Sequence, residues 1–282
     1  MKTVEAPEIM QEIIAKEKAQ GKTVALVPTM GYLHKGHISL LKEGRKQGDI
    51  LVLSVFVNPT QFGANEDLDK YPRDINSDLK IAEENGVDYV FTPKAELMYP
   101  KGFQTYIEVE ELSRPMCGKS RPTHFRGVAT VVCKLFNIVM PDVALFGRKD
   151  YQQLAVIKQM VSDLNITVRI LGMPIVREND GLAMSSRNVY LSKEERRSSL
   201  SLIEAINTAK KMFAEGEAKV SELREKVVAT INSYPFTSIE YIDFRDSESL
   251  KEQEQAKENT LLALAVKIGE TRLIDNSLLG EG

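Results

Sequence analysis

The stretch TVALVPTMGYLHKGH, residues 23–37, contains the pattern that decides the fold. Its first six residues form an apolar run that is typical of a buried strand, and a helical pattern follows from Gly36 to Gln47. Two of the chain's three histidines, His34 and His37, lie at this junction between strand and helix. A strand that leads directly into a helix indicates a β–α–β unit and therefore a parallel sheet.

The same alternation of apolar runs and helical patterns continues as far as residue 173. The expected strands are 23–28, 50–57, 88–93, 143–147 and 167–173, and the expected helices are 36–47, 73–85, 128–140 and 151–163. The strands of a parallel sheet are covered on both faces, which explains their continuous apolar sequences. We therefore expect an α/β fold with a parallel sheet and right-handed crossovers.

The second half of the chain changes character. Long charged helical patterns cover 193–214 and 217–233, and β-rich segments follow at 238–246, 260–268 and 271–276. Helices followed by a run of strands indicate an α+β domain with an antiparallel sheet. We place the boundary near Pro174, which gives a ligand-binding domain at 1–174 and a smaller α+β domain at 175–282.

Composition narrows the possible partners. The chain has 282 residues and a formal net charge of −3, which does not favour a broad nucleic-acid-binding surface. Its longest strongly apolar run, 50–57, is far too short to span a bilayer. The first residues lack the long apolar core of a secretory signal. We expect a soluble cytoplasmic protein that acts on small molecules, without a nucleic-acid or membrane partner.

His34 and His37 lie where a parallel sheet binds its ligands, beyond the carboxyl end of a strand. A helix that starts there offers unpaired N–H groups and partial positive charge, which suit phosphate. Residues at i and i+3 share one side of a helix, and Gly36 between them lets a ligand approach the backbone. A metal-binding pair and two surface histidines are the alternatives, although the neighbouring residues supply no further metal ligands.

Five motifs occur in an order that resembles one known family. They are PTMGYLHKGH (28–37), FVNPTQF (56–62), YPRD (71–74), GRKDYQQL (147–154) and MSSRN (184–188). Together they resemble the pantothenate synthetase family, within the nucleotidyltransferase superfamily that carries the "HIGH" motif. The resemblance implies a Rossmann-like nucleotidyltransferase domain followed by a smaller α+β domain. We predict that this smaller domain closes as a lid, because SSRN lies just past the boundary and must meet ATP bound on the other domain.

The resemblance also implies a reaction. Members of the family are ligases that condense (R)-pantoate with β-alanine to give pantothenate, AMP and pyrophosphate. The reaction passes through an enzyme-bound pantoyl adenylate, with ATP as co-substrate. Mg²⁺ is expected to be held mainly by the ATP phosphates rather than by a protein cage. The family is typically homodimeric, and a homodimer is therefore expected here.

The implied nucleotide site draws on three of the motifs, 28–37, 147–154 and 184–188, together with Val176. The implied catalytic residues are His37, His34 and Lys149. The implied ATP-binding residues are Met30, Gly31, His34, Gly36, His37, Gly147, Arg148, Lys149, Asp150, Val176, Met184, Ser185, Ser186 and Arg187. Without the resemblance, Lys149 would be interpreted as a surface lysine paired with Asp150. Similarly, residues 185–188 would be interpreted as the entry to a helix, because Ser192 and Glu195 form a capping-box pattern.

The implied organic-substrate site uses two glutamines and an apolar wall. Gln61 and Gln153 suit the hydroxyls and carboxylate of pantoate, because an amide both donates and accepts hydrogen bonds. The resemblance places Gln61 near β-alanine as well. Met30 and Phe62 are candidates for the wall around the gem-dimethyl group, and core packing is their alternative role. His124 belongs to a loop that resembles a family loop near the site, and a structural role is favoured for it.

Two other functions compete with the ligase. An adenylyltransferase acting on pantetheine phosphate or nicotinate mononucleotide would transfer AMP and stop there. The paired glutamine motifs and the C-terminal α+β region favour the ligase instead. A non-catalytic RNA-binding relative of the synthetases is disfavoured by the acidic balance and the intact HKGH and SSR sequences.

Overall fold

The chain forms two compact units in the computed structural model, which describes residues 1–63 and 66–281. Unit 1 contains Met1–Arg114, Gly118–Arg148 and Gln152–Pro174. Unit 2 contains the remainder, which is Pro115–Cys117, Lys149–Tyr151 and Ile175–Gly282. Among the described residues, no helix is long and apolar enough to cross a bilayer.

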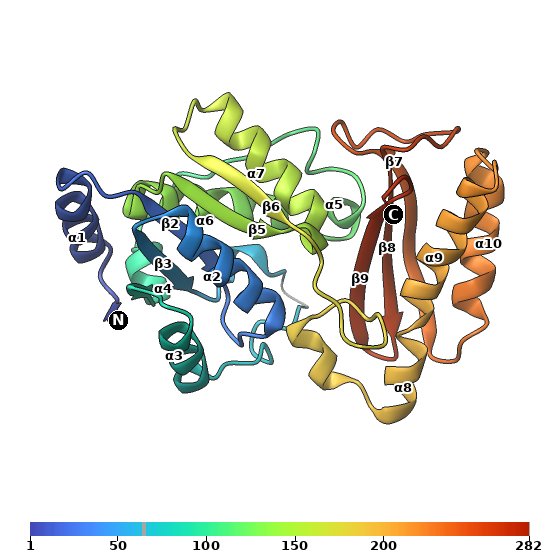
Figure 1. Ribbon diagram of the computed structural model, residues 1–282, viewed down its shortest axis with the longest axis horizontal. Helices are drawn as coiled ribbons and strands as arrows, with labels where there is room; N and C mark the ends of the chain where they lie inside the picture. The colour runs from blue at the N-terminus through green and yellow to red at the C-terminus, as the bar shows by residue number, and fades with distance from the viewer. Residues whose placement is uncertain (64–65, 282) are drawn as a thin grey trace. The chain divides into compact units, whose positions relative to one another are not determined.

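Unit 1 is built on a parallel sheet with the strand order β1-β4-β3-β2-β5-β6 (Figure 1). The strands are β1 (Lys2–Val4), β2 (Val24–Thr29), β3 (Ile50–Val55), β4 (Tyr89–Phe91), β5 (Val143–Gly147) and β6 (Arg169–Met173). Every neighbouring pair runs parallel. The α/β fold with a parallel Rossmann-like sheet is therefore confirmed, and β1 is an edge strand that the sequence pattern did not reveal.

Helices connect the strands of this sheet. They are α1 (Pro7–Ala19), α2 (Lys35–Gln47), α3 (Ile75–Glu84), α4 (Ala95–Met98), α6 (His124–Val139) and α7 (Tyr151–Asp163), and α5 (Cys117–Ser120) is a single turn. Right-handed crossovers place α2 and α3 on one face and α1, α6 and α7 on the other. Contacts between α1 and α6 agree with this arrangement. The helix expected at 128–140 in fact begins at His124.

The order of the strands reverses between β2 and β5. From β2 the chain moves through β3 to β4 on one side, and from β5 it moves to β6 on the other. Ligands of open α/β sheets bind beyond the carboxyl ends of the strands at such a switch point. The segment after β2 carries His34 and His37, and the segment after β5 carries Lys149. The switch point of the sheet thus coincides with the motifs that carry His34, His37 and Lys149, which were also identified from the sequence.

Unit 2 contains an antiparallel sheet with the order β7-β8-β9, as expected for an α+β region. Its strands are β7 (Thr237–Asp246), β8 (Thr260–Ile268) and β9 (Thr271–Leu278), and its helices are α8 (Lys193–Ser198), α9 (Ser201–Ala214) and α10 (Val220–Asn232). The continuous helix expected at 193–214 is wrong, because the chain breaks between α8 and α9. At the break the Ser199 hydroxyl donates to the carbonyl of Arg196, a local bond that competes with helix continuation.

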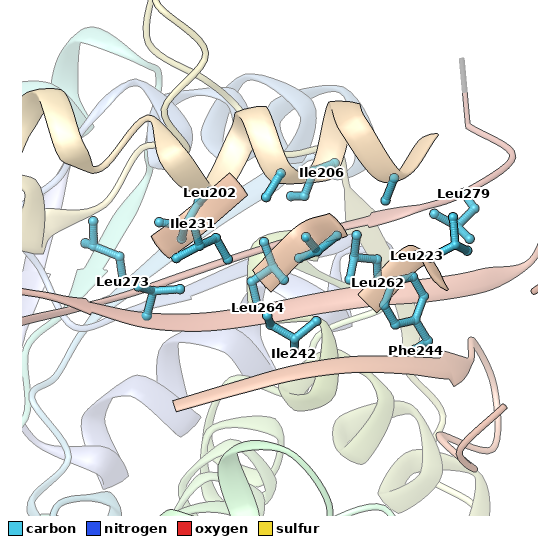
Figure 2. Close-up of a cluster of buried hydrophobic side chains, with 14 of the residues drawn as sticks. Leu202, Ile206, Leu223, Ile231, Ile242, Phe244, Leu262, Leu264, Leu273 and Leu279 are labelled. Carbon is cyan, nitrogen blue, oxygen red and sulfur yellow. The ribbon is translucent and has the colours of Figure 1, made fainter. Parts of the chain in front are cut away.

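One apolar cluster holds unit 2 together. Alternate residues of β8, including Leu262 and Leu264, point toward side chains from α9 and α10 such as Leu202 and Leu223 (Figure 2). Residues at every second position of β8 and residues along one side of each helix are therefore buried in the same layer. This layer makes unit 2 a packed body that can present its loops in a fixed geometry.

Truncation of Leu264 tests how far unit 2 depends on this layer. Leu264 is fully buried at the centre of the cluster, so Leu264→Ala is expected to lower the free energy of unfolding by roughly 2–5 kcal/mol. Urea unfolding followed by circular dichroism measures the loss. Leu164→Ala is the matched control, because that leucine is 51% exposed and should change stability little. Equal stability of the two variants would contradict the packing account.

Candidate active site

Two histidines close the N-terminus of α2. His34 is the N-cap residue, and its Nδ1 accepts a hydrogen bond from the backbone N–H of Gly36 at 3.1 Å. His37 is the third helical residue, and its Nδ1 accepts from the backbone N–H of His34 at 3.3 Å. The arrangement is a capping box in which imidazoles replace the usual hydroxyl and carboxylate. It brings the two ring centroids to 4.1 Å from each other.

These bonds decide where each ring carries its proton. A ring nitrogen that accepts a hydrogen bond has no hydrogen, so the neutral tautomer of both histidines carries its proton on Nε2. Each imidazole therefore has an N–H donor on the side away from the cap. A pair of such donors at a helix N-terminus suits an anion whose charge increases during reaction.

The turn before α2 is held by a buried carboxylate from another helix. Asp78 of α3 is 2% exposed and accepts from the backbone N–H groups of Tyr32 at 2.9 Å and Leu33 at 2.7 Å. Burial raises the pKa of Asp78, whereas the bonds from Leu33 and Tyr32 oppose that rise. Gly31, with a φ of +85°, has no room for a side chain, since a Cβ there would lie 2.8 Å from Asp78 Oδ2. Asp78 thus fixes the backbone that leads to His34.

Asp78→Asn is expected to reduce both stability and turnover. The amide would place an NH₂ group against one of the two backbone N–H donors, leaving a buried group unpaired at a cost of roughly 1–3 kcal/mol. Displacement of His34 and His37 is expected to lower kcat by about tenfold or more, because small misplacements are costly in catalysis. Steady-state kinetics and thermal unfolding measure the two effects. Glu83→Gln, on an exposed position of α3, serves as the control and should behave as the parent.

Gln61 lies in a network of buried polar groups after β3. It is 8% exposed at the end of the short 3-10 helix η1 (Pro59–Gln61). Its Nε2 contacts Met30 Sδ at 3.2 Å, and its Oε1 accepts from Asn58 at 3.1 Å. His124 Nδ1 lies 2.9 Å from the Gln61 carbonyl oxygen. His124 therefore contacts the backbone of Gln61, which supplies a structural role for that histidine.

A cavity of about 390 Å³ opens beside this network in unit 1. Met30, Phe56 and Pro59 supply apolar parts of its wall, and Asp74 and Asp78 supply carboxylates. Phe62 does not line it but packs edge to face on Tyr71, with ring centroids 6.0 Å apart. Met30 is thus positioned to contact a small ligand with both polar and apolar groups.

Arg121 is paired rather than extended toward a ligand. Its Nε donates to Glu66 Oε1 at 2.8 Å, and its Nη2 donates to the carbonyl of Gln61 at 3.2 Å. The Arg121 guanidinium thus bonds to the main chain of Gln61, while Asn58 bonds to the side chain of the same glutamine. Neither Asn58 nor Glu66 was selected from the sequence, although Asn58 belongs to the quoted motif FVNPTQF.

The lysine motif is anchored through its backbone. β5 ends at Gly147, and Lys149 lies two residues further along in the 3-10 turn η2 (Arg148–Asp150). In unit 2, the side chain of Asn276 on β9 donates to the carbonyl oxygen of Lys149 at 2.8 Å. The main chain of Lys149 is therefore fixed independently of its ammonium group. Gln153 lies one turn beyond, near the start of α7.

The MSSRN segment follows a tight hairpin of unit 2. The backbone N–H of Met184 donates to Val176 at 2.9 Å, which closes the hairpin. Ser185 then caps the 3-10 helix η3 (Ser186–Tyr190), with its hydroxyl accepting from the N–H of Arg187 at 3.3 Å. Ser186 is 7% exposed. The expected capping box of Ser192 and Glu195 is confirmed immediately downstream.

The candidate residues thus divide between the two units. Unit 1 brings His34 and His37 to one helix end, and in the same unit the side chains of Met30 and Gln61 are in contact. Lys149 and the 184–187 segment belong to unit 2. Asp78 is the functional candidate that sequence reasoning missed, and no local signal identified it because its partners lie 45 and 46 residues away.

A parallel sheet with a histidine-capped helix at its switch point defines the class of Rossmann-like nucleotidyltransferases with the HIGH motif. The model of one protein family, described as pantoate-beta-alanine ligase, matches residues 2–278. The chain therefore belongs to the pantoate–β-alanine ligase family.

Individual relatives match this chain along almost their whole length. The pantothenate synthetase of Geotalea uraniireducens is 60% identical over 281 residues, covering 100% of both chains. That of Geobacter sulfurreducens is 58% identical, covering 100% of this chain and 99% of the relative. The crystal structure of pantothenate synthetase from Thermus thermophilus has a TM-score of 0.95 and 41% identity, with 100% of both chains covered.

A further solved relative carries ligands. The pantoate-beta-alanine ligase of Francisella tularensis, complexed with beta-gamma ATP and beta-alanine, has a TM-score of 0.82 and 34% identity. The match covers 100% of this chain and 99% of that one. The likeness therefore includes unit 2 as well as the parallel sheet of unit 1.

Proposed function

We propose that the chain catalyses the ATP-dependent condensation of (R)-pantoate with β-alanine. The products are pantothenate, AMP and pyrophosphate, and pantoyl adenylate is the enzyme-bound intermediate. The observation that carries this proposal is the match to the ligase family over residues 2–278, which includes both units. The ATP and β-alanine bound by the Francisella tularensis relative support the same substrates here.

The reaction proceeds in two displacements. A carboxylate oxygen of pantoate attacks the α-phosphorus of ATP, and the bond from that phosphorus to the oxygen bridging to the β-phosphate breaks. The amine of β-alanine then attacks the acyl carbon, AMP departs, and the nitrogen loses a proton. The first step requires an anionic carboxylate to meet an anionic triphosphate, so positive charge and N–H donors must lie along the triphosphate. The second requires that the mixed anhydride be kept from water until the amine attacks.

His34, His37 and Lys149 are proposed as the catalytic groups. The Nε2–H donors of the histidine pair stabilise charge on the phosphates as pyrophosphate departs, and the Lys149 ammonium acts as a compact point charge. The remaining proposed ATP contacts are Met30, Gly31, Gly36, Gly147, Arg148, Asp150, Val176, Met184, Ser185, Ser186 and Arg187. Gly147 is proposed to lie against the nucleotide base, and the space beside its Cα is open, since a Cβ built there meets no atom of a non-neighbouring residue within 4 Å.

Gln61, Gln153, Met30 and Phe62 are proposed to bind pantoate and β-alanine. The contact between Gln61 and Met30 supports a shared pocket with a polar and an apolar wall. A buried amide such as that of Gln61 discriminates against analogues without a hydroxyl, because they would leave it unpaired. Phe62 is proposed on the family resemblance, since in this structure its ring packs on Tyr71.

Mg²⁺ is proposed to arrive with ATP. Within the described residues no group of three or more His, Cys, Asp or Glu side chains is arranged to hold a metal ion. The ligands proposed for Mg²⁺ are mainly the phosphate oxygens of ATP and water, which this cation usually keeps. The ion would neutralise phosphate charge, while the chain's own donors orient the triphosphate.

The division into residues 1–174 and 175–282 is proposed to be functional. The first part would bind ATP and pantoate, and the second would act as a lid hinged near Pro174. Arg187 belongs to unit 2 and the histidine pair to unit 1, which supports this division of labour. A closed lid would also keep water from the mixed anhydride.

Closure is expected to make the particle more compact when substrates bind. Small-angle scattering with ATP and pantoate together should give a smaller radius of gyration than scattering from the protein alone. Pantoate without ATP provides the control, because it leaves the phosphate contacts of unit 2 unmade. An identical scattering profile in all three samples would contradict closure.

A cytoplasmic homodimer is proposed as the working form. The homodimer is proposed on the family resemblance, and the cytoplasmic location on the sequence pattern given above. The substrates are small molecules, and neither a nucleic acid nor a membrane is proposed as a partner. Analytical ultracentrifugation of the full chain tests the dimer, and a single monomeric species at micromolar concentration would refute it.

Isotope exchange from pyrophosphate into ATP tests the proposed reaction. Exchange is expected only when pantoate is present, because adenylate formation must precede pyrophosphate return. Subsequent addition of β-alanine should release pantothenate and AMP. Exchange that needs no pantoate, or adenylate that β-alanine cannot discharge, would refute the ligase and favour an adenylyltransferase.

A further inference from the structure

A tight hairpin leads into the MSSRN segment of unit 2. Arg177 and Ala183 form an antiparallel bridge, and the backbone N–H of Glu178 donates to the carbonyl of Leu182 at 2.8 Å. The turn is closed by the N–H of Gly181, which donates to the carbonyl of Glu178 at 2.9 Å. Gly181 has a φ of +96°, a conformation that other residues adopt at a cost. The hairpin therefore has a defined geometry before the segment begins.

The Glu178 carboxylate joins this hairpin to the two elements that follow it. Its Oε1 accepts from Asn188 Nδ2 at 2.7 Å, and Asn188 directly follows Arg187 in η3. Its Oε2 accepts from Arg196 Nη2 at 2.9 Å, and Arg196 belongs to α8. Asn188 Nδ2 also donates to the carbonyl of Ala183 at 3.2 Å. The Glu178 carboxylate thus connects Asn188, which directly follows the stretch that carries Ser185, Ser186 and Arg187, to α8. Through Asn188 the stretch is also bonded to the carbonyl of Ala183 that precedes it.

Further charge reinforces both sides of the hairpin. Arg196 Nη2 lies 2.6 Å from Asp180 Oδ2, at the tip of the turn. On the other side, Arg177 makes a bidentate pair with the buried Asp275 of β9, at 2.6 and 3.0 Å. A bidentate arginine–carboxylate pair fixes orientation as well as distance. The hairpin is therefore attached to the sheet of unit 2, and Glu178 extends that attachment to η3.

We propose that Glu178 is a positioning residue of the nucleotide site, acting through Asn188 and Arg196. It holds η3 so that the Ser185–Ser186 segment and the Arg187 guanidinium meet the departing phosphates in a fixed geometry. This inference rests on the proposed phosphate contact of Arg187. Glu178 itself does not contact the substrate. By holding η3 in place beforehand, it reduces the entropy that would be lost if the segment carrying Arg187 became ordered only during the reaction.

Glu178→Gln separates positioning from general packing. The amide keeps the size of the side chain and one carbonyl oxygen, but it removes the charge that faces Arg196. The rate of adenylate formation is expected to fall about tenfold or more, because small displacements of an orienting group are costly. The kcat/KM for β-alanine should not change, since β-alanine reacts with the adenylate after pyrophosphate has left. Glu252→Gln is the matched control, because Glu252 makes an ion pair with Arg224 at 3.7 Å elsewhere in unit 2.

A double-mutant cycle with Arg187→Ala provides the decisive readout. If Glu178 acts by placing Arg187, its substitution should cost little once Arg187 is absent, so the two effects on single-turnover adenylation should be strongly non-additive. Additive effects would overturn the positioning role alone. A normal rate in Arg187→Ala would overturn the proposed phosphate contact and this inference together. Should Glu178→Gln fail to fold, the same cycle is run with Asn188→Ala, which removes the other arm of the connection.

Discussion

Replacement of His37 by alanine is expected to lower the rate of pantoyl-adenylate formation by on the order of a hundredfold or more, as for the loss of one charge-stabilising donor. The Nδ1 atom of His37 accepts from the His34 backbone, so the ring presents its proton on Nε2. Alanine removes that donor from the end of α2 at the point where charge develops on the departing phosphates. Rapid-quench measurement of adenylate in a single turnover reports the effect directly.

A second substitution separates this role from helix capping. Glutamate at the third helical position completes a capping box in the ordinary way, so His37→Glu should keep the bond to the backbone N–H of His34. The glutamate carboxylate offers no hydrogen-bond donor to a phosphate, and its negative charge repels the phosphates. A folded His37→Glu variant without adenylation activity is therefore expected. Adenylation at the parent rate in either variant would show that His37 serves only the helix end.

Lys149→Ala is expected to reduce adenylation by about a hundredfold or more, since it removes a charge that acts on the reacting phosphates. Folding should be little affected, because the backbone of Lys149 is held by Asn276 and this bond does not involve the ammonium group. Single-turnover kinetics and the thermal midpoint are measured on the same preparation. Lys149→Arg is expected to recover part of the rate, because it restores the charge without the compact shape of an ammonium.

Lys158→Ala is the matched control for this lysine. Lys158 is exposed on α7, so its loss should change neither rate nor stability. A lowered thermal midpoint with intact turnover in Lys149→Ala would instead assign Lys149 a structural role. The comparison therefore distinguishes a catalytic charge from a surface lysine.

Much of the fold was predictable because the strands of unit 1 are continuous apolar runs. The strand expected at 143–147 and the helix expected at 151–163 match β5 and α7 at both ends. β1 was missed because its pattern of three residues is too short to show a period. α1 was missed although signals existed, since Pro7 starts it and the buried Met10 and Ile14 lie four residues apart.

The candidate site was predictable only where chemistry is carried by local motifs. The histidine pair could be recognised because strand, glycine and helix follow one another within residues 23–37. The sequence predicted that both histidines lie on one side of a helix starting at about Gly36. In the structure the helix begins at Lys35, and His34 is the N-cap residue outside it. Asp78 and Glu178 could not be assigned their contacts, because a hydrogen bond across the fold leaves no periodic trace in the sequence.

The central claim is that the histidine pair, Lys149 and the serine–arginine segment act on one triphosphate. A crystal structure of the protein with pantoate, Mg²⁺ and the non-reactive analogue α,β-methylene ATP tests it most directly. The account predicts that His37 Nε2, Lys149 Nζ and the Arg187 guanidinium all lie within hydrogen-bond distance of the same phosphate chain. A nucleotide bound beyond the reach of any one of these groups would contradict it.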